Sequence, residues 1–158
     1  MIAKGLGSPI HIPKETRMNF SSINWLAVIA CVVASMIIGA IWFGPKTFYP
    51  MWWKSIGRSE KDDPGQGMNM GLMWGLTIFA SLVQAVFMAL MVNAMGSMSG
   101  GATLASGATA GFLLWLGFAA PLALTNKLFA NQLTAWILEQ GNHLITFVVM
   151  GAILGAWH

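Results

Sequence analysis

Two side chains near the end of the chain have the types and the spacing that proton transfer needs. Glu139 and His143 are four residues apart, so on a helix they share one face and could together accept a proton. Asn126 is the third polar residue that this part of the sequence offers to the same site. A second interpretation stays open, in which Glu139 and His143 only anchor a helix end among lipid headgroups. The sequence therefore predicts where a polar site lies and leaves both of these roles open.

Two amide side chains stand inside residues 71–94, a stretch that has no charged residue. Gln84 lies near the middle of this stretch and Asn93 lies further along it. Polar groups inside an apolar segment are costly and therefore point to a function. For Gln84 we consider two roles, a hydrogen bond to another helix and a contact with a ligand or a pore. We interpret Asn93 as a polar group near a helix end.

Metal, phosphate and nucleophile chemistry have little support in the sequence. Cys31 is the only cysteine, and His11 and His158 lie too far out to pair with His143 across a core. The chain contains no HExxH motif, no glycine-rich phosphate loop and no Ser/His/Asp constellation. Three methionines alternate with other residues at 68, 70 and 73; they resemble a soft-metal series, but methionine also fills gaps between helices. We expect no metal and no cofactor.

The elements that hold these residues follow from the distribution of charge. Of the 158 residues 56% are hydrophobic and only 8% are charged, whereas a soluble domain has about 25% charged residues. Asp, Glu, Lys and Arg are absent from residues 18–45, 64–126 and 140–158. A membrane-spanning helix needs about 20 apolar residues, so these stretches hold one, two and one spans. The sequence predicts an all-α membrane protein with four transmembrane helices in a compact bundle.

The expected boundaries follow from turn and breaker residues. The four spans are expected at residues 25–43, 71–94, 102–125 and 133–157. Residues 46–57 mix aromatic residues with lysines, which is typical of a short element at the membrane surface. Residues 96–101 form a small-residue turn, and residues 126–132 form a loop. We expect residues 1–18 to be a poorly ordered extension, with Met18 as a natural start, and residues 19–158 to form one transmembrane domain.

Glycines at four-residue spacing predict close helix packing, because small residues let helix backbones approach each other in lipid. The candidate packing positions are Gly71, Gly75, Gly107, Gly111, Gly151 and Gly155. They could serve packing within one bundle or self-association into an oligomer. Tryptophans near the span ends are expected to anchor the helices at the interface. These anchors are Trp25, Trp42, Trp52, Trp53, Trp136 and Trp157.

Five separated patterns connect the chain to a known family. They are INWLAV at residues 23–28, GAIWFGP at 39–45, WLGF at 115–118, TNKLF at 125–129 and MGAILGAW at 150–157. In this order the chain resembles the bacterial family of domain of unknown function 1761, over nearly all of residues 19–157. The resemblance implies a small inner-membrane protein with four spans, and it implies no activity. Glu139 is less typical of the family than Asn24, Trp25, Trp42 or Asn126.

These observations favour a non-enzymatic membrane protein, either an accessory subunit or a binder of lipid or another small apolar molecule. One alternative is a small oligomeric transporter or channel whose path is lined by Gln84, Asn93 and His143. Another is an interfacial enzyme that uses His143 with Glu139 and Asn126. We expect the lipid bilayer as a partner, a homo-oligomer or larger membrane complex as a further one, and no nucleic acid, because the basic residues are dispersed. Counting Lys and Arg places loops 44–70 and 126–132 in the cytoplasm and both termini outside.

Overall fold

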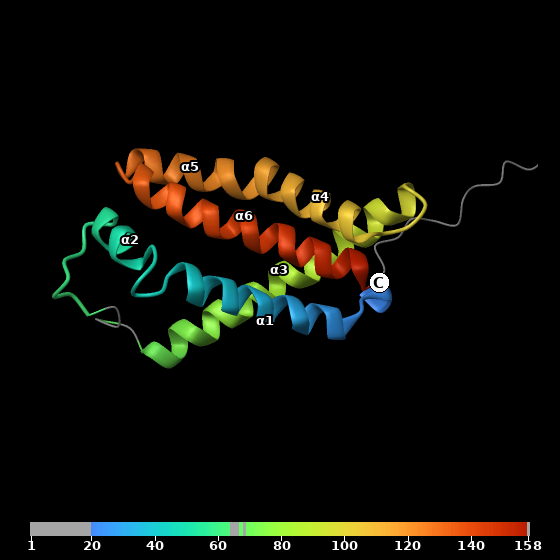
Figure 1. The fold of residues 1–158 in the computed structure, drawn as a ribbon, viewed down its shortest axis with the longest axis horizontal. Coiled ribbons are helices and arrows are strands. Elements are labelled where there is room, and N and C mark those ends of the chain that lie inside the picture. Colours follow the sequence, from blue (N-terminus) through green and yellow to red (C-terminus); the bar gives the residue numbers. More distant parts are fainter. Residues whose placement is uncertain (1–19, 64–66, 68, 158) are drawn as a thin grey trace, which may run out of the picture.

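The computed structural model describes residues 20–63, 67 and 69–157, and the predicted extension at residues 1–18 lies outside them. Four helical segments within this part are long and apolar enough to cross a membrane. They are α1 (Trp25–Trp42), α3 (Met70–Met98), the run from Leu104 to Phe129, and α6 (Leu133–Ala156). A 3-10 turn, η1 (Phe20–Ser22), precedes α1, and the short helix α2 (Tyr49–Ser55) follows it. Figure 1 shows the long helices side by side, and the predicted all-α, four-span architecture is confirmed.

The start of α1 is fixed by an asparagine that makes two kinds of contact. The Asn24 side-chain oxygen accepts hydrogen bonds from the backbone N–H groups of Leu26 and Ala27, at 3.1 and 3.2 Å. These groups have no partner inside the helix, so such a cap stabilises a helix by about 1 kcal/mol. The Asn24 amide nitrogen also donates to the carbonyl of Trp157 at 3.2 Å. One side chain therefore joins the beginning of α1 to the end of α6.

The turn between α3 and the next helix is shorter than the sequence predicted. Residues 96–98 continue α3 as helix, and the chain turns at residues 99–103 instead of 96–101. Gly100 and Gly101 have φ angles of 84° and 133°, which only glycine adopts without strain. Thr103 and Ser106 then begin the next helix with a capping box, in which each side chain accepts the other's backbone N–H. This tight turn makes α3 and the following helix antiparallel neighbours.

The third span is one continuous run of three helical types. It consists of α4 (Leu104–Leu114), the π-helical turn η2 (Trp115–Ala119) and α5 (Ala120–Phe129). Pro121 explains the change, because its ring would clash with the carbonyl four residues earlier in a regular helix, and a wider turn relieves this. The expected end of this span at Thr125 and the loop at residues 126–132 are wrong in part, since residues 126–129 are helical. The chain reverses only at residues 130–132.

The helix α6 lies at the centre of the bundle. It packs against α1, α3, α4 and α5, and it also contacts α2. The buried apolar core between the helices is built largely from small side chains such as Ala27, Ala85 and Ala110, with Met150 of α6 completely buried among them. Cys31 is buried there as well and donates to the carbonyl of Met150 at 3.6 Å. Small side chains allow the close helix contacts that replace the hydrophobic effect in lipid.

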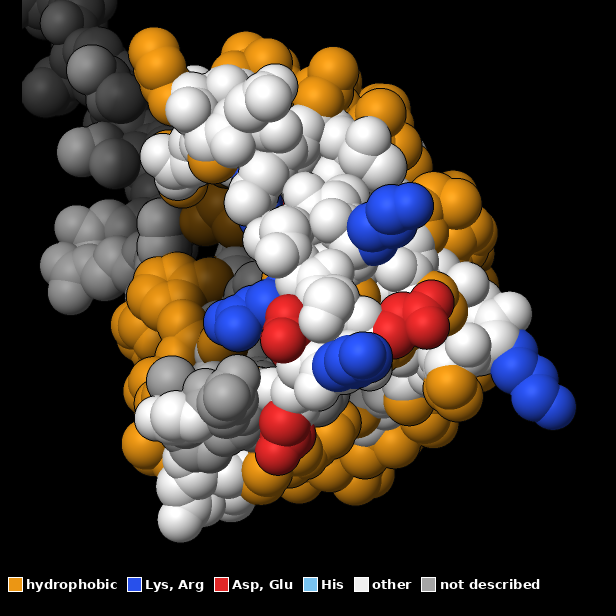
Figure 2. Space-filling view, turned by 90° about the vertical axis from the view of Figure 1, so that its left-hand side faces the viewer, with side chains coloured by type: hydrophobic (Ala, Val, Ile, Leu, Met, Phe, Trp, Pro, Cys, Tyr) orange, Lys and Arg blue, Asp and Glu red, His pale blue; other side chains and the backbone are white. Residues whose placement is uncertain are grey.

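The surface divides into an apolar belt and one charged end. Large apolar side chains face outward along the helices; Phe118 and Leu122 are each 72% exposed, as contact with lipid tails requires. All charged residues in the described ranges belong to the end where α2 lies, and Figure 2 shows them gathered on this face. They are Lys46, Lys54, Arg58, Glu60, Lys61, Asp62, Asp63, Lys127 and Glu139. The molecule is thus a multi-pass membrane protein with one strongly polar end.

Candidate functional site

A cavity of about 500 Å³ lies between α1, α2, α3 and α6. Polar side chains from all four helices line it. They are Ser35 of α1, Tyr49 of α2, Thr77, Ser81 and Gln84 of α3, and Asn142, His143 and Thr146 of α6. We call this space the polar cavity. Its volume falls in the range of about 300–1,000 Å³ that is usual for small-molecule sites.

Helix periodicity brings these side chains together. On α6, Asn142 and Thr146 are four residues apart and His143 lies beside Asn142, so all three turn toward α3 and α1. On α3, Thr77, Ser81 and Gln84 follow the same spacing of four and three residues. Each helix thus presents a polar stripe at the contact between them. Polar side chains at such a contact can join two helices by hydrogen bonds in lipid, so the hydrogen bonds that they make decide their role.

Two of the lining residues are deeply buried and lack hydrogen bonds. Asn142 is 8% exposed and Thr146 is 5% exposed. The Asn142 amide nitrogen and the Thr146 hydroxyl have no hydrogen-bond partner in the described structure, and the hydroxyl of Tyr49 has none either. An unsatisfied buried polar group costs about 1–3 kcal/mol. Three such groups around one cavity indicate that the site is built for something that satisfies them.

Aromatic rings form the rest of the wall. Phe43, Tyr49, Trp52 and Trp74 line the cavity near the end where α2 lies. Tyr49 stacks on Trp53, with ring centroids 5.6 Å apart and an angle of 19° between the rings. Phe43 meets the ring of Trp52 edge to face, with centroids 5.4 Å apart. The cavity therefore offers flat apolar surfaces beside its polar stripe, which suits a ligand with both characters.

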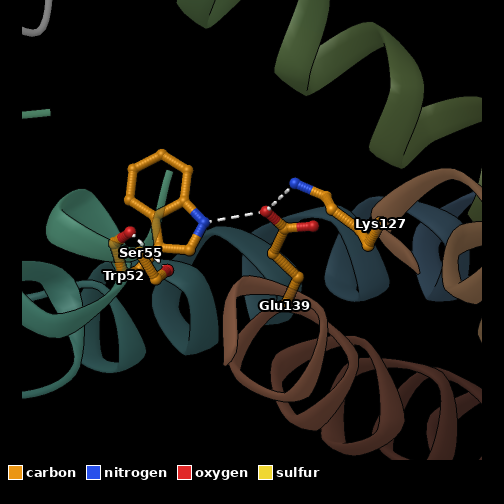
Figure 3. A network of polar contacts seen from close by, with 4 residues as sticks. All are labelled: Trp52, Ser55, Lys127 and Glu139. Carbon is orange, nitrogen blue, oxygen red and sulfur yellow. Dashed lines mark hydrogen bonds and ion pairs between the residues drawn. The ribbon is translucent and has the colours of Figure 1, made fainter. Parts of the chain in front are cut away.

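A network of polar contacts holds α2 on the bundle beside the cavity. The carboxylate oxygen Oε1 of Glu139 accepts from the indole N–H of Trp52 and pairs with the Lys127 ammonium, both at 2.8 Å. Figure 3 shows these three side chains converging from α2, α5 and α6. Both charged side chains are about one-fifth exposed. The charge of Glu139 is thus balanced by Lys127 and is directed toward α2.

One sequence comparison gives the chain a family. The sequence model of the family described as "Protein of unknown function (DUF1761)" matches residues 26–155. The chain belongs to the DUF1761 family. The match runs from the first turn of α1 to the last turn of α6, so it contains each residue of the polar cavity. No curated protein and no solved structure matches the chain.

The candidate residues in this DUF1761 protein do not form one site. His143 and Gln84 both line the polar cavity, as the transporter hypothesis expected of a common path. Asn126 is exposed near the end of α5, and Glu139 contacts Trp52 and Lys127. Asn93 lies at the other end of the molecule, in a separate hollow beside the α3–α4 turn. The described residues hold no group of three His, Cys, Asp or Glu side chains that could bind a metal.

The six glycines proposed for packing lie in two different settings. Gly107 and Gly111 of α4 face α6, where Gly151 and Gly155 meet them. A Cβ atom on any of these four would fall on a backbone carbonyl of the facing helix. Gly71 and Gly75 lie instead on an exposed stretch of α3, and a Cβ on Gly75 would meet nothing within 4 Å. The close approach of helices is therefore concentrated between α4 and α6.

The six tryptophans proposed as interfacial anchors also differ in their surroundings. Trp25 and Trp157 are exposed, at 55% and 45%, at the end opposite α2. Trp53 is half-buried and donates to the carbonyl of Ser59 at 2.8 Å. Trp42 and Trp136 reach other helices, because their indole N–H groups donate to the carbonyls of Leu138 and Ala120. These last two contacts, with that of Trp52, link helices to each other at the charged end.

Sequence reasoning missed six polar residues of the cavity: Ser35, Tyr49, Thr77, Ser81, Asn142 and Thr146. Two spacing patterns in the sequence could have identified three of these residues. Asn142 and Thr146 continue the polar face of α6 that begins at Glu139, and Ser81 precedes Gln84 by three residues on α3. Read as stripes instead of single residues, these positions indicate two polar helix faces. The signal for Tyr49 is absent, because only the fold places α2 against the bundle.

Proposed function

We propose that this DUF1761 protein binds a small amphipathic molecule in the polar cavity, within the membrane and without catalysis. The observation that carries the proposal is the pair of unpartnered groups on Asn142 and Thr146, which are buried beside a cavity large enough for a ligand. Buried polar groups in proteins are nearly always hydrogen-bonded, so a ligand that satisfies them offsets their cost. The aromatic wall supports a ligand whose remaining part is apolar.

The enzyme and transporter hypotheses receive less support from the same geometry. Asn126 and Glu139 lie outside the lining of the cavity, and Glu139 is held by Trp52 and Lys127. His143 therefore has no catalytic partner among the residues that the sequence suggested. Asn93, which a transport path would include, lines a hollow at the opposite end and not the polar cavity. A binder needs neither partner for His143 nor a path through the molecule.

Native mass spectrometry of protein extracted gently from its own membrane tests the binding proposal. We expect a bound small molecule with the wild type and at least a tenfold lower bound fraction with the Asn142→Leu Thr146→Val double variant, because both hydrogen-bonding groups are gone. The double variant is expected to fold at least as well as the wild type, since it removes two unsatisfied buried groups.

Asn93→Leu is the matched control, because it makes the same amide-to-leucine change at the other end of the bundle. It should leave the bound fraction unchanged. A wild-type protein without any bound molecule, or a double variant that keeps it, would contradict the proposal. A protein subunit that co-purifies in place of a small molecule would support the accessory-subunit alternative.

We also propose that the charged end faces the cytoplasm at a bacterial inner membrane. Five basic residues lie at this end, and the described part of the opposite end has none, which agrees with the excess of Lys and Arg in cytoplasmic loops. Cysteine labelling tests this, because Cys31 is buried and should not react.

In intact cells, a membrane-impermeant maleimide should label Ser97→Cys, near the α3–α4 turn, and should not label Ser59→Cys, near α2. Both serines are exposed in the structure, so the expected difference comes from the membrane alone. The reverse pattern would overturn the orientation.

A further inference from the structure

The hydrogen-bonding groups of the polar cavity define the chemistry of its ligand. The Asn142 amide nitrogen is a donor only, and it has no partner in the described part of the chain. The ligand group that complements this donor is an acceptor oxygen. The hydroxyls of Tyr49 and Thr146 are unpartnered as well and can each donate a further hydrogen bond. Of the unpartnered groups buried at this site, the amide is a donor and the two hydroxyls can donate, so an acceptor oxygen on the ligand suits all three.

Two other hydroxyls of the lining have already used their protons. Ser35 donates to the carbonyl of Val32, and Thr77 donates to the carbonyl of Met73, both at 2.8 Å. Hydroxyls on helices often bond to the preceding turn in this way, and only their lone pairs then remain. They can accept from a ligand but cannot supply donors. The Asn142 amide therefore remains the buried donor that most needs an acceptor from the ligand.

The ligand's polar part should carry no charge. The lining contains no Lys, Arg, Asp or Glu. Lys127, which contacts α6, is already paired with Glu139. A charged group buried without a partner of opposite charge costs far more than a neutral one. A carboxylate or phosphate in the cavity would meet no lysine or arginine, and His143 is the single lining side chain that can become a cation.

We propose that the ligand is an uncharged, lipid-soluble carbonyl compound. Its carbonyl oxygen accepts a hydrogen bond from the Asn142 amide, and its apolar body lies against the rings of Phe43, Trp52 and Trp74. This inference rests on the proposed binding function and adds the class of molecule that is bound. It also states that Asn142 makes the cavity prefer a carbonyl compound to a hydrocarbon.

Three probes of nearly equal size separate the chemical classes. Acetylnaphthalene is a neutral ketone, isopropylnaphthalene is the hydrocarbon of the same shape, and naphthoate is the anion. Their Kd values are measured by equilibrium dialysis against the full-length protein in lipid nanodiscs, with empty nanodiscs as the background. We expect the ketone to bind the wild type about tenfold more tightly than the hydrocarbon, because one buried donor is satisfied. We expect naphthoate to bind more weakly than both.

The variant Asn142→Leu should remove the preference and leave the hydrocarbon bound. Its expected effect is a Kd for the ketone that rises about tenfold, to that of the hydrocarbon. Asn126→Leu, at an exposed amide outside the cavity, should keep the wild-type preference. The hydrocarbon itself reports that the variant cavity is folded.

The outcomes separate the two proposals. Equal binding of ketone and hydrocarbon by the wild type would overturn the carbonyl inference and leave the binding function standing. Tightest binding of naphthoate would also overturn it, in favour of an anionic ligand. If Asn142→Leu still prefers the ketone to the hydrocarbon, Asn142 does not select the carbonyl group. If none of the three probes binds above the background, both the inference and the binding function are contradicted.

Discussion

Replacing Gly151 by alanine is expected to destabilise the folded bundle by about 3 kcal/mol or more. The new Cβ atom would fall on the carbonyl oxygen of Gly107 and lie 3.2 Å from the backbone nitrogen of Gly111. All of these obstacles belong to the backbone of α4, so no side-chain rotation can make room. The two helices must move apart along their shared glycine face, and the packing that joins them in lipid is lost.

Gly75→Ala is the matched control for this substitution. It also lies inside a long helix, but its new Cβ would meet nothing within 4 Å. The change should therefore be neutral or stabilise α3 by up to about 1 kcal/mol, because alanine favours helix more than glycine does. Reversible unfolding in mixed SDS micelles, followed by tryptophan fluorescence, measures both variants. Equal stability of Gly151→Ala and Gly75→Ala would show that α4 and α6 do not pack through their glycines.

Removing the positive charge of Lys127 is expected to cost about 2 kcal/mol, because it leaves the carboxylate of Glu139 with only Trp52 as a partner. Breaking a fully buried ion pair costs about 3–5 kcal/mol, and the value is reduced here because both side chains are about one-fifth exposed. The Lys127→Met variant should show this loss in its free energy of unfolding. Since Glu139 also holds Trp52, the attachment of α2 should weaken at the same time.

A second substitution distinguishes the effect of the unpaired Glu139 charge from the effect of lost side-chain packing. In Lys127→Met Glu139→Gln the charge is gone and the amide oxygen can still accept from Trp52, so about half of the lost stability should return. Lys54→Met, at an exposed lysine near the end of α2, should change the stability by less than about 0.5 kcal/mol. The same unfolding assay measures all three variants. A double variant less stable than Lys127→Met would mean that the pair acts through packing instead of charge.

The sequence was sufficient for the helices because the bilayer imposes their length. Three stretches without charge predict four spans, and α1 and α6 begin at Trp25 and Leu133 as expected. The boundaries that were wrong lie where a helix continues beyond its expected end: α3 continues past Gly96, and the third span continues past Thr125 to Phe129. Gly96 did not end α3, because the positive φ angles of this turn occur later, at Gly100 and Gly101. Pro121 lies inside the third span as expected, and a π-helical turn accommodates it.

The site was harder to predict because its contacts join distant parts of the chain. Spacing alone paired Glu139 with His143, since both lie on one face of α6. The structure gives Glu139 its partners from α2 and α5, which only the fold brings near. In the same way, Gln84 and His143 meet across a cavity between two helices. Local spacing identifies which faces are polar, and tertiary packing decides what those faces meet.

The uneven distribution of charge has a consequence for how the protein enters the membrane. The turn between α3 and α4, at residues 99–103, consists of Ser, Gly, Gly, Ala and Thr, and no charged side chain lies in either helix. These two helices can therefore be inserted together as a hairpin without translocating a charge through hydrocarbon, where each one costs at least about 2.5–3.5 kcal/mol. The charges that the structure describes remain on the side from which this hairpin enters. Insertion of the pair then requires only the transfer of a small uncharged turn.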